Sequence, residues 1–213
     1  SHGMIFSEVE IGVGSASDGI LVLPHEVPVG TLAKEYYNVE SDYVLEIDLT
    51  PNRVDATSHF GVARDLAAYL KQAGLPHTLQ KPSVAHFAIE VEGHDREACP
   101  RCSGLTRRNG KVAESPTWLK NGLHAIGQRT INNVVDITNY VLHELGQPLH
   151  AFDVSKIAGN KVVVRTVESG TPFTTLDEEE RTLHPNDLMI CNAHEGMCIA
   201  GVFGGAKSGV TEA

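Results

Sequence analysis

One stretch of the sequence marks the point where helical patterns give way to strand patterns: Asn132-Asn133-Val-Val-Asp136-Ile-Thr-Asn139-Tyr-Val-Leu-His-Glu-Leu145-Gly146-Gln-Pro-Leu-His150-Ala-Phe-Asp153. Its first part predicts a helix, because apolar side chains recur at helical spacing as far as Leu145. An asparagine can cap the first turn, and Gly146 supplies the left-handed residue that often ends a helix. The remaining residues, with Pro148, predict a loop.

Two more helices are predicted on the N-terminal side of this stretch. Ser115-Pro116 is typical of a helix start, with the serine as cap and the proline at the first helical position, and this helix is expected to run to Gly127. An earlier helix is predicted from Ser58 to Ala73, with Gly74 as its C-terminal stop.

Strand patterns lie mainly on the C-terminal side. Short β-branched or apolar runs predict strands there, at Val162–Val167, Thr182–Leu183, Leu188–Cys191 and Met197–Phe203. Alternating apolar residues predict two earlier strands, at Val44–Leu49 and at residues 87–91. The acidic run Asp177–Glu180 predicts a hairpin loop. Because helices are grouped before the main set of strands, the sequence predicts an α+β fold.

Composition points to a water-soluble protein. The 213 residues carry a formal net charge of -10, no apolar run approaches the roughly 20 residues that span a bilayer, and no signal peptide opens the chain. We therefore expect a cytoplasmic protein with no membrane partner. Residues 100–135 are an exception to the acidity, with six basic side chains against Glu114 alone. This basic segment is either a solvated patch or a surface that faces RNA.

Four cysteines raise the question of a metal site. Cys99 and Cys102 have the spacing of half a zinc site, and Cys191 and Cys198 are the only cysteines that might complete it. The second pair is spaced more widely than a zinc knuckle requires. Buried thiols are the simpler interpretation, and we expect no metal site.

Residues 201–208, Gly-Val-Phe-Gly204-Gly205-Ala-Lys207-Ser208, resemble a phosphate-binding loop only in part. That motif needs glycine directly before Lys-Ser and a helix directly after it. Ala206 occupies the glycine position, and the following residues are a poor helix start. The glycines indicate instead a tight turn or a closely lined pocket.

Three blocks carry a more specific resemblance. Glu46-Ile-Asp-Leu-Thr50-Pro-Asn-Arg53, with Asp55 and Gly61-Val-Ala-Arg64-Asp65, resembles a signature of the bacterial phenylalanyl-tRNA synthetase beta subunit. Residues 133–153 resemble the centre of the editing domain of that subunit. Phe203-Gly204-Gly205, with Ser208-Gly209, matches a third block. The three blocks occur in the family's order and extend over most of the chain.

The resemblance implies a phenylalanine-tRNA ligase built from two alpha and two beta chains. It places ATP, magnesium and phenylalanine on the alpha subunit, with no cofactor in this part of the beta subunit. It implies that the beta subunit hydrolyses tyrosine wrongly attached to phenylalanine tRNA. Residues 1–82 would comprise the end of a tRNA-binding-fold insertion and a small mixed domain, and residues 83–213 an editing domain truncated at its C-terminal end.

The same resemblance assigns site residues position by position. Arg129 would lie near the acceptor end of the tRNA, and His150 and Gly204 would line the editing pocket, with His150 orienting a water and not serving as an obligatory base. The family residues that recognise the tyrosine hydroxyl would lie beyond Ala213. We therefore expect an internal piece of a longer protein with an incomplete pocket.

Two other functions stay open at this point. The chain is alternatively a non-catalytic tRNA-positioning or scaffold module of the synthetase, although the retained His150 and Gly204 argue against that. It is alternatively a free-standing deacylase, although Thr50-Pro-Asn-Arg53 is typical of the synthetase subunit.

Overall fold

The computed structural model describes residues 5–14, 16–82, 92–93, 97–107 and 110–211. The chain divides into two compact units, Ser1–Leu45 and Glu46–Ala213. The predicted boundary between residues 82 and 83 adjoins residues 83–91, which lie outside the described ranges, and so it stays a prediction. The strand predicted at residues 87–91 lies outside them too.

The first unit consists mainly of turns around one short helix, α1 (Ala33–Tyr36). Backbone hydrogen bonds close its loops, such as that from Leu21 N to Phe6 O at 2.8 Å. The predicted strand at Val44–Leu49 is wrong, because this segment is extended but forms no ladder among the described residues. Its apolar side chains are exposed, and Leu45 has 79% of its surface accessible to solvent. These side chains therefore do not pack in a sheet of the described residues.

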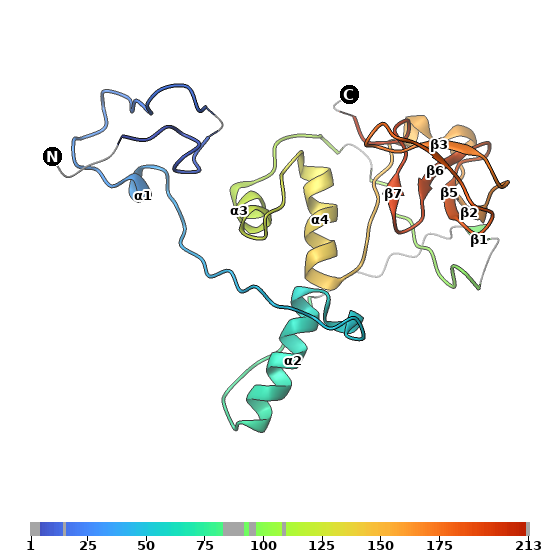
Figure 1. Cartoon of the computed structure of the whole chain (residues 1–213), viewed down its shortest axis with the longest axis horizontal. Coiled ribbons are helices and arrows are strands. Elements are labelled where there is room, and N and C mark those ends of the chain that lie inside the picture. Colours follow the sequence, from blue (N-terminus) through green and yellow to red (C-terminus); the bar gives the residue numbers. More distant parts are fainter. Residues whose placement is uncertain (1–4, 15, 83–91, 94–96, 108–109, 212–213) are drawn as a thin grey trace. The chain divides into compact units, whose positions relative to one another are not determined.

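The second unit opens with the 3-10 helix η1 (Val54–Ala56) and the helix α2 (His59–Gln72). The Ser58 hydroxyl caps α2 by accepting a hydrogen bond from Gly61 N, and Gly74 has the left-handed φ of +68° expected after a helix end. The start of α2 meets the end of α4, where His59 Nδ1 lies 2.9 Å from His143 O (Figure 1). Helix α2 confirms the helix predicted from Ser58 to Ala73.

Helices α3 (Thr117–Ala125) and α4 (Asn133–Leu145) pack against each other. Asn132 caps α4 by accepting hydrogen bonds from Val134 N and Val135 N, and Gly146 ends it with a φ of +73°. The predicted serine cap of α3 is wrong: the N-cap is Pro116, without a side-chain cap. The Ser115 hydroxyl instead donates to Asp136 Oδ2 on α4, 2.5 Å away.

The C-terminal part of the unit is a five-stranded sheet in the order β1-β2-β5-β6-β7. Its strands are β1 (Glu92–Gly93), β2 (Val163–Thr166), β5 (Leu188–Cys191), β6 (Gly196–Ile199) and β7 (Phe203–Gly204). Two 3-10 turns, η2 (Val154–Lys156) and η3 (Ala158–Asn160), precede β2. Among the described strands, β1 and β2 are the only parallel pair. The single strand predicted at Met197–Phe203 is two strands, since a turn at Gly201 (φ +71°) folds β7 back on β6.

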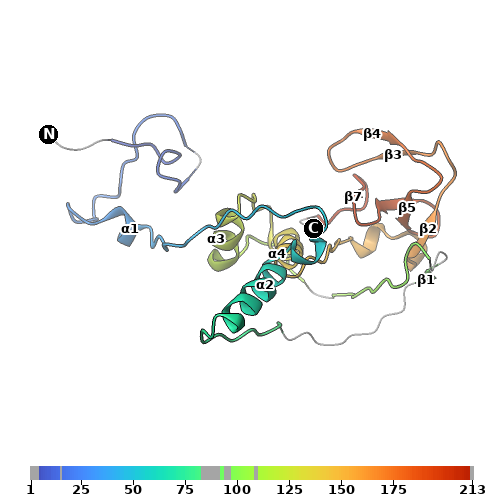
Figure 2. The ribbon, with the colours of Figure 1, turned by 60° about the horizontal axis from the view of Figure 1, so that its bottom comes forward.

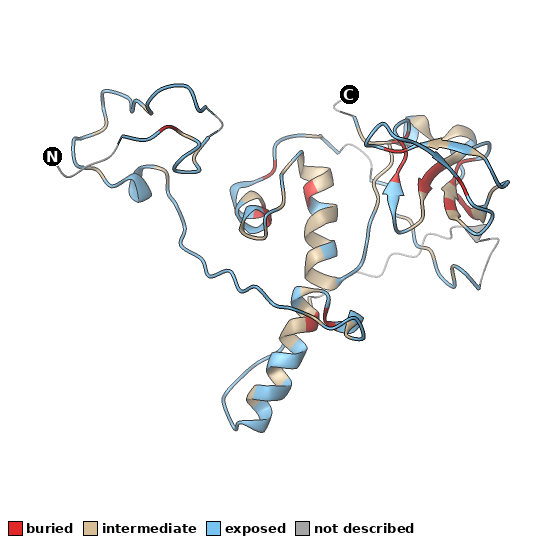
Figure 3. Cartoon of the chain, viewed as in Figure 1, coloured by how far each residue is buried: buried red, intermediate tan, exposed pale blue. Residues whose placement is uncertain are grey.

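A hairpin of β3 (Pro172–Thr174) and β4 (Glu180–Thr182) lies alongside β7, and an isolated bridge joins Thr175 to Gly205 (Figure 2). The loop between β3 and β4 confirms the predicted hairpin turn. The main apolar core lies in this sheet region, where buried residues gather in Figure 3. It contains Leu183, Met189 and Cys191, with Phe173 and Ile199 packed against them. The observed architecture is α+β, as predicted.

Candidate functional site

His150 lies in the loop that follows α4, with its ring centroid 4.5 Å from that of Phe152. Within the described ranges, its Nε2 atom is buried and has no hydrogen-bond partner. A buried polar atom without a partner is uncommon in native structures and is a place to look for a bound group. Burial also lowers the pKa of the His150 imidazole, so the ring is neutral at pH 7.

Gly204, in β7, lies directly against this ring. A Cβ atom on Gly204 would overlap His150 Cε1 and would lie 3.0 Å from His150 Nε2 and 2.9 Å from Leu176 Cδ1. Only glycine therefore fits beside the imidazole without a shift of its neighbours. The structure thus brings together the two residues that the sequence places in one pocket, and adds Leu176, which the sequence did not indicate.

Hydrogen bonds fasten the His150 loop to the segment after β7. Asp153 N donates to Ser208 O at 3.3 Å, and Thr211 Oγ1 donates to Asp153 Oδ2 at 3.1 Å. Lys156 Nζ donates to Gly209 O at 2.9 Å. Two blocks that are about fifty residues apart in sequence therefore form one local structure around His150 and Gly204.

Arg129 is not part of this cluster. It is exposed in the loop between α3 and α4, and among the described residues no ion pair or hydrogen bond joins it to His150 or Gly204. Its guanidinium is free to meet solvent or an anionic partner. Its assignment to the acceptor end of a tRNA stays a prediction.

The polar residues near the start of α4 have structural partners. Asn133 Nδ2 donates to Lys111 O at 3.0 Å, and Asn133 Oδ1 accepts from Ala113 N at 3.2 Å. Asp136 is completely buried and accepts hydrogen bonds from Ser115 Oγ and from Ile131 N, the latter at 2.8 Å. Helix capping and anchoring account for this group.

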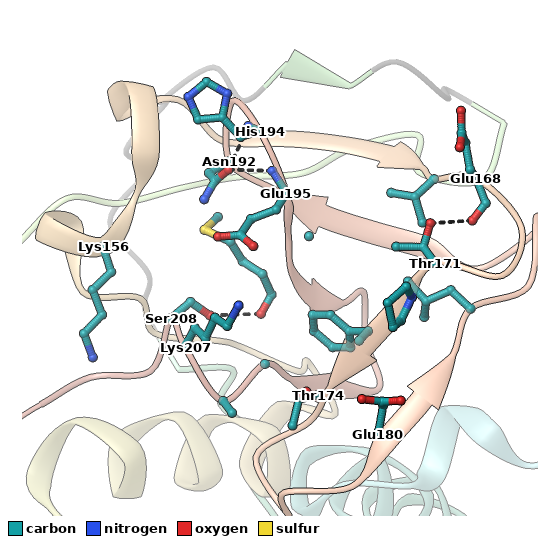
Figure 4. Close-up of a pocket in the computed structure, with 18 of the residues that line it drawn as sticks. Lys156, Glu168, Thr171, Thr174, Glu180, Asn192, His194, Glu195, Lys207 and Ser208 are labelled. Carbon is teal, nitrogen blue, oxygen red and sulfur yellow. Dashed lines mark hydrogen bonds between the residues drawn. The ribbon is translucent and has the colours of Figure 1, made fainter.

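An open cavity of about 650 Å³ lies beside the sheet, and its lining includes Gly205 but not His150 (Figure 4). A Cβ on Gly205 would meet Met197 O at 2.7 Å and the Phe173 ring, both on the cavity side. Phe173 and Met197 are among the apolar residues that line the cavity. Its polar lining includes His194 and the charged side chains of Lys156, Arg165, Glu168, Glu180, Glu195 and Lys207. Sequence reasoning missed this cavity because its walls come from separate turns and strands.

The cysteines fit the interpretation as packed thiols. Cys191 on β5 and Cys198 on β6 are buried, and Cys99 and Cys102 are half-buried. Burial raises the pKa of the Cys198 thiol to about 11, so this sulfur is protonated at neutral pH. Within the described ranges, no three His, Cys, Asp or Glu side chains are grouped to hold a metal ion.

The segment 201–208 is not a phosphate-binding loop followed by a helix. It forms a turn, β7 and a second turn, and no helix follows in the described residues. As for the membrane, none of the described helices combines the length and apolarity needed to cross a bilayer.

Comparison with known proteins identifies the family. A family model described as the B3/4 domain matches residues 98–213, which is more than half of the chain. The phenylalanine–tRNA ligase beta subunit of Porphyromonas gingivalis is 62% identical over 219 residues, covering 100% of this chain and 27% of the relative. The beta subunit of Bacteroides thetaiotaomicron is 60% identical over 222 residues, with the same coverage. That of Salinibacter ruber is 48% identical over 218 residues, covering 99% of this chain and 26% of the relative.

These matches confirm the resemblance drawn from the three sequence blocks. The chain spans about a quarter of the length of the curated relatives that it matches, 27% in the first two cases. The matches to the beta subunits extend over residues before 98 as well, where the family model does not reach. The chain therefore belongs to the B3/4 domain family and is similar along its whole length to phenylalanine–tRNA ligase beta subunits.

Proposed function

We propose that this chain carries an editing site that hydrolyses the ester bond between tyrosine and phenylalanine tRNA. The observation that carries the proposal is the buried Nε2 of His150 beside Gly204, which has no hydrogen-bond partner in the described part of the chain. An apolar aminoacylation pocket cannot strongly reject an isostere that adds only a hydroxyl group, so a second, hydrolytic site is needed for accuracy. The names of the relatives supply the context of phenylalanine and tRNA.

The neutral imidazole suits the orientation of a water molecule. In the proposed step, the water oxygen attacks the ester carbonyl carbon and the bond from that carbon to the ribose oxygen breaks. The proton passes to the ribose oxygen, which leaves free tyrosine and a tRNA with its terminal hydroxyl restored. His150 Nε2 would hydrogen-bond the water and fix its direction of attack, since a positioned reactant loses little further entropy on reaction.

The partners follow from the same proposal. The beta subunit would assemble as two alpha and two beta chains in the cytoplasm, with ATP, magnesium and phenylalanine bound by the alpha subunit. Arg129 would contact a phosphate near the acceptor end of the tRNA, because an exposed guanidinium with no partner among the described residues is available for an anion. If so, Arg129→Ala weakens tRNA binding and lowers its salt dependence by about one phosphate contact, without a change in kcat.

The test uses the full-length beta subunit assembled with its alpha partner and preformed tyrosyl-tRNA specific for phenylalanine. We expect His150→Ala to slow hydrolysis by about tenfold or more. The control is His77→Ala, which removes an exposed histidine whose Nδ1 lies 3.0 Å from Leu75 O, and it should hydrolyse at the wild-type rate. Equal rates for wild type and His150→Ala would refute the role of His150. A wild-type assembly that does not hydrolyse the ester would favour the scaffold alternative.

A further inference from the structure

A small polar cluster closes the loop between β3 and β4. Arg181 on β4 donates from Nε to Thr175 Oγ1 at 2.9 Å and from a terminal nitrogen to Asp177 Oδ2 at 2.6 Å. The Thr175 hydroxyl in turn donates to Asp177 Oδ1. A hydroxyl has one hydrogen and two acceptor sites, so these contacts satisfy Thr175, which is completely buried. We name Thr175, Asp177 and Arg181 the Arg181 clamp.

The Arg181 clamp fixes a backbone conformation that the loop would not hold alone. Glu178 has a φ of +64°, in the left-handed region that side chains with a Cβ rarely adopt. Such a residue persists only where its surroundings hold it in place. The hydrogen bond from the Thr175 hydroxyl, followed by that from Arg181, holds the pKa of Asp177 below its usual range. The carboxylate therefore stays charged and keeps its place in the cluster at neutral pH.

The same loop is fastened to β7, the strand that contains Gly204. Leu176 N donates to Gly204 O at 3.0 Å, and Ala206 N donates to Thr174 O at 3.1 Å. The Arg181 guanidinium also lies over the Phe203 ring, 5.9 Å from its centroid, within the range of a cation–π interaction. Arg181 thus contacts both the loop and the residue that precedes Gly204.

The loop that the Arg181 clamp closes also contains Leu176. This side chain is half exposed, and its Cδ1 atom lies against Gly204 on the side where His150 Nε2 also lies. Leu176 and His150 therefore both lie against the same side of Gly204 and leave no room there for a Cβ atom. A half-exposed leucine at the tip of a hairpin would move freely if only its own packing held it. The clamp and the two backbone hydrogen bonds determine where it lies.

We propose that Arg181 is a positioning residue for the His150 site, holding Leu176 as a fixed apolar wall beside Gly204. This role rests on the proposed function, in which His150, beside Gly204, orients the water that attacks the aminoacyl ester. Arg181 touches no reacting atom. It acts through the loop, so its loss affects the alignment of the ester and leaves contacts with the body of the tRNA intact.

A contribution to folding stability does not by itself explain the ion pair between Arg181 and Asp177. The side chains of Arg181 and Asp177 are 46% and 37% exposed, and ion pairs at such positions contribute little to stability. Arg53 offers a matched comparison in the same unit. It pairs with Asp55 and Asp65 and is 38% exposed, but the structure gives it no contact with His150, Leu176 or Gly204.

The test measures steady-state hydrolysis of tyrosyl-tRNA by the full-length alpha–beta assembly. We expect Arg181→Ala to lower kcat by about tenfold with KM for the tRNA unchanged. Arg181→Lys should recover only part of the loss, because an ammonium cannot reproduce the two-pronged contact of a guanidinium. Arg53→Ala should leave kcat at the wild-type value. Wild-type kcat in Arg181→Ala, or an equal loss in Arg53→Ala, would overturn the proposal.

Hydrogen exchange tests whether the Arg181 clamp holds the loop, independently of whether the proposed function is right. In Arg181→Ala we expect the Leu176 amide, and that of its neighbour Ala206, to lose protection, while the amides of α4 keep theirs. Unchanged protection at both positions would overturn the clamp itself. If the wild-type protein fails to hydrolyse the ester, the proposed function is wrong, and the positioning role of Arg181 in the reaction is wrong as well, even where the loss of protection is seen.

Discussion

Asp136, within α4, and His150, in the loop that follows α4, are two polar residues with different surroundings. Asp136, on α4, is completely buried, and its two oxygens accept hydrogen bonds from Ser115 and Ile131. His150, past the end of α4, has a buried Nε2 without a partner in the described part of the chain. The first joins α4 to the segments before α3 and before α4 itself. The second is available for a hydrogen bond with a group from outside the protein.

This difference indicates that two residues of one sequence motif have different roles. Both lie in the block 133–153 that carries the family resemblance, so sequence similarity alone does not distinguish architecture from chemistry. A polar group with all its partners inside the protein stabilises the fold. A buried group without one costs stability and is retained where function requires it. Changes at Asp136 should therefore act on folding, and changes at His150 on reaction.

The largest effect on stability is expected at Asp136. Asp136→Ala leaves the Ser115 hydroxyl and the Ile131 amide without their acceptor, which should lower the free energy of unfolding by about 2–4 kcal/mol. Urea denaturation of the 213-residue chain measures it. Glu168→Ala, which removes an exposed carboxylate, should change the free energy of unfolding by less than about 0.5 kcal/mol. Similar values for both variants would remove Asp136 from its anchoring role.

A smaller loss of stability is expected at Gly204. In Gly204→Ala the new methyl group meets His150 and Leu176, so the free energy of unfolding should fall by about 1–3 kcal/mol. Gly122→Ala is the matched control. Gly122 lies within α3 with no atom near its Cβ direction, and alanine there should raise the free energy of unfolding by about 0.5–1 kcal/mol. Opposite signs for the two variants are the expected result, and a stabilising Gly204→Ala would contradict the close packing around His150.

The pH dependence of stability should reveal the burial of His150. Burial holds its pKa below the ordinary value of 6.5, so the unfolded chain takes up this proton at a higher pH than the folded chain. The contribution of His150 to stability is fully present above pH 6.5 and decreases as the pH falls towards the folded-state pKa. One proton limits the slope to about 1.4 kcal/mol per pH unit. We expect the difference in unfolding free energy between wild type and His150→Gln to vary with pH in this window. A constant difference would mean that the imidazole is solvated.

The smallest effect is expected at Glu178, in the loop that carries Leu176. Glu178→Gly removes the Cβ that strains the left-handed backbone at φ +64°, and the greater freedom of glycine in the unfolded chain offsets part of the gain. The free energy of unfolding should rise by no more than about 1 kcal/mol. Thermal unfolding monitored by circular dichroism is the measurement. A clear loss of stability would show that the glutamate side chain itself supports the loop.

Local signals in the sequence predicted much of the fold. Ser58 and Gly74 bound α2, and Asn132 and Gly146 bound α4, because caps act within one turn of the chain. The failures concern partners distant in sequence. Ser115 matches a helix cap but bonds Asp136 instead, and Val44–Leu49 alternates like a strand but has no strand to join among the described residues.

The candidate site could be predicted only in part, for the same reason. The resemblance named His150 and Gly204, and the structure brings them together. Leu176 and Arg181 belong to a hairpin with no distinctive motif. Their contribution depends on the pairing of Thr175 with Gly205, which joins residues thirty positions apart. No local spacing in the sequence reveals such a contact.

The most direct test of the contrast between Asp136 and His150 measures stability and hydrolysis on the same two variants. His150→Ala and Asp136→Asn would be made in the full-length assembly and compared with wild type at a temperature where all three are folded. We predict that His150→Ala unfolds within about 1 kcal/mol of wild type but hydrolyses tyrosyl-tRNA at least about tenfold more slowly, whereas Asp136→Asn is less stable and hydrolyses at close to the wild-type rate. Loss of hydrolysis in Asp136→Asn with normal hydrolysis in His150→Ala would contradict the account.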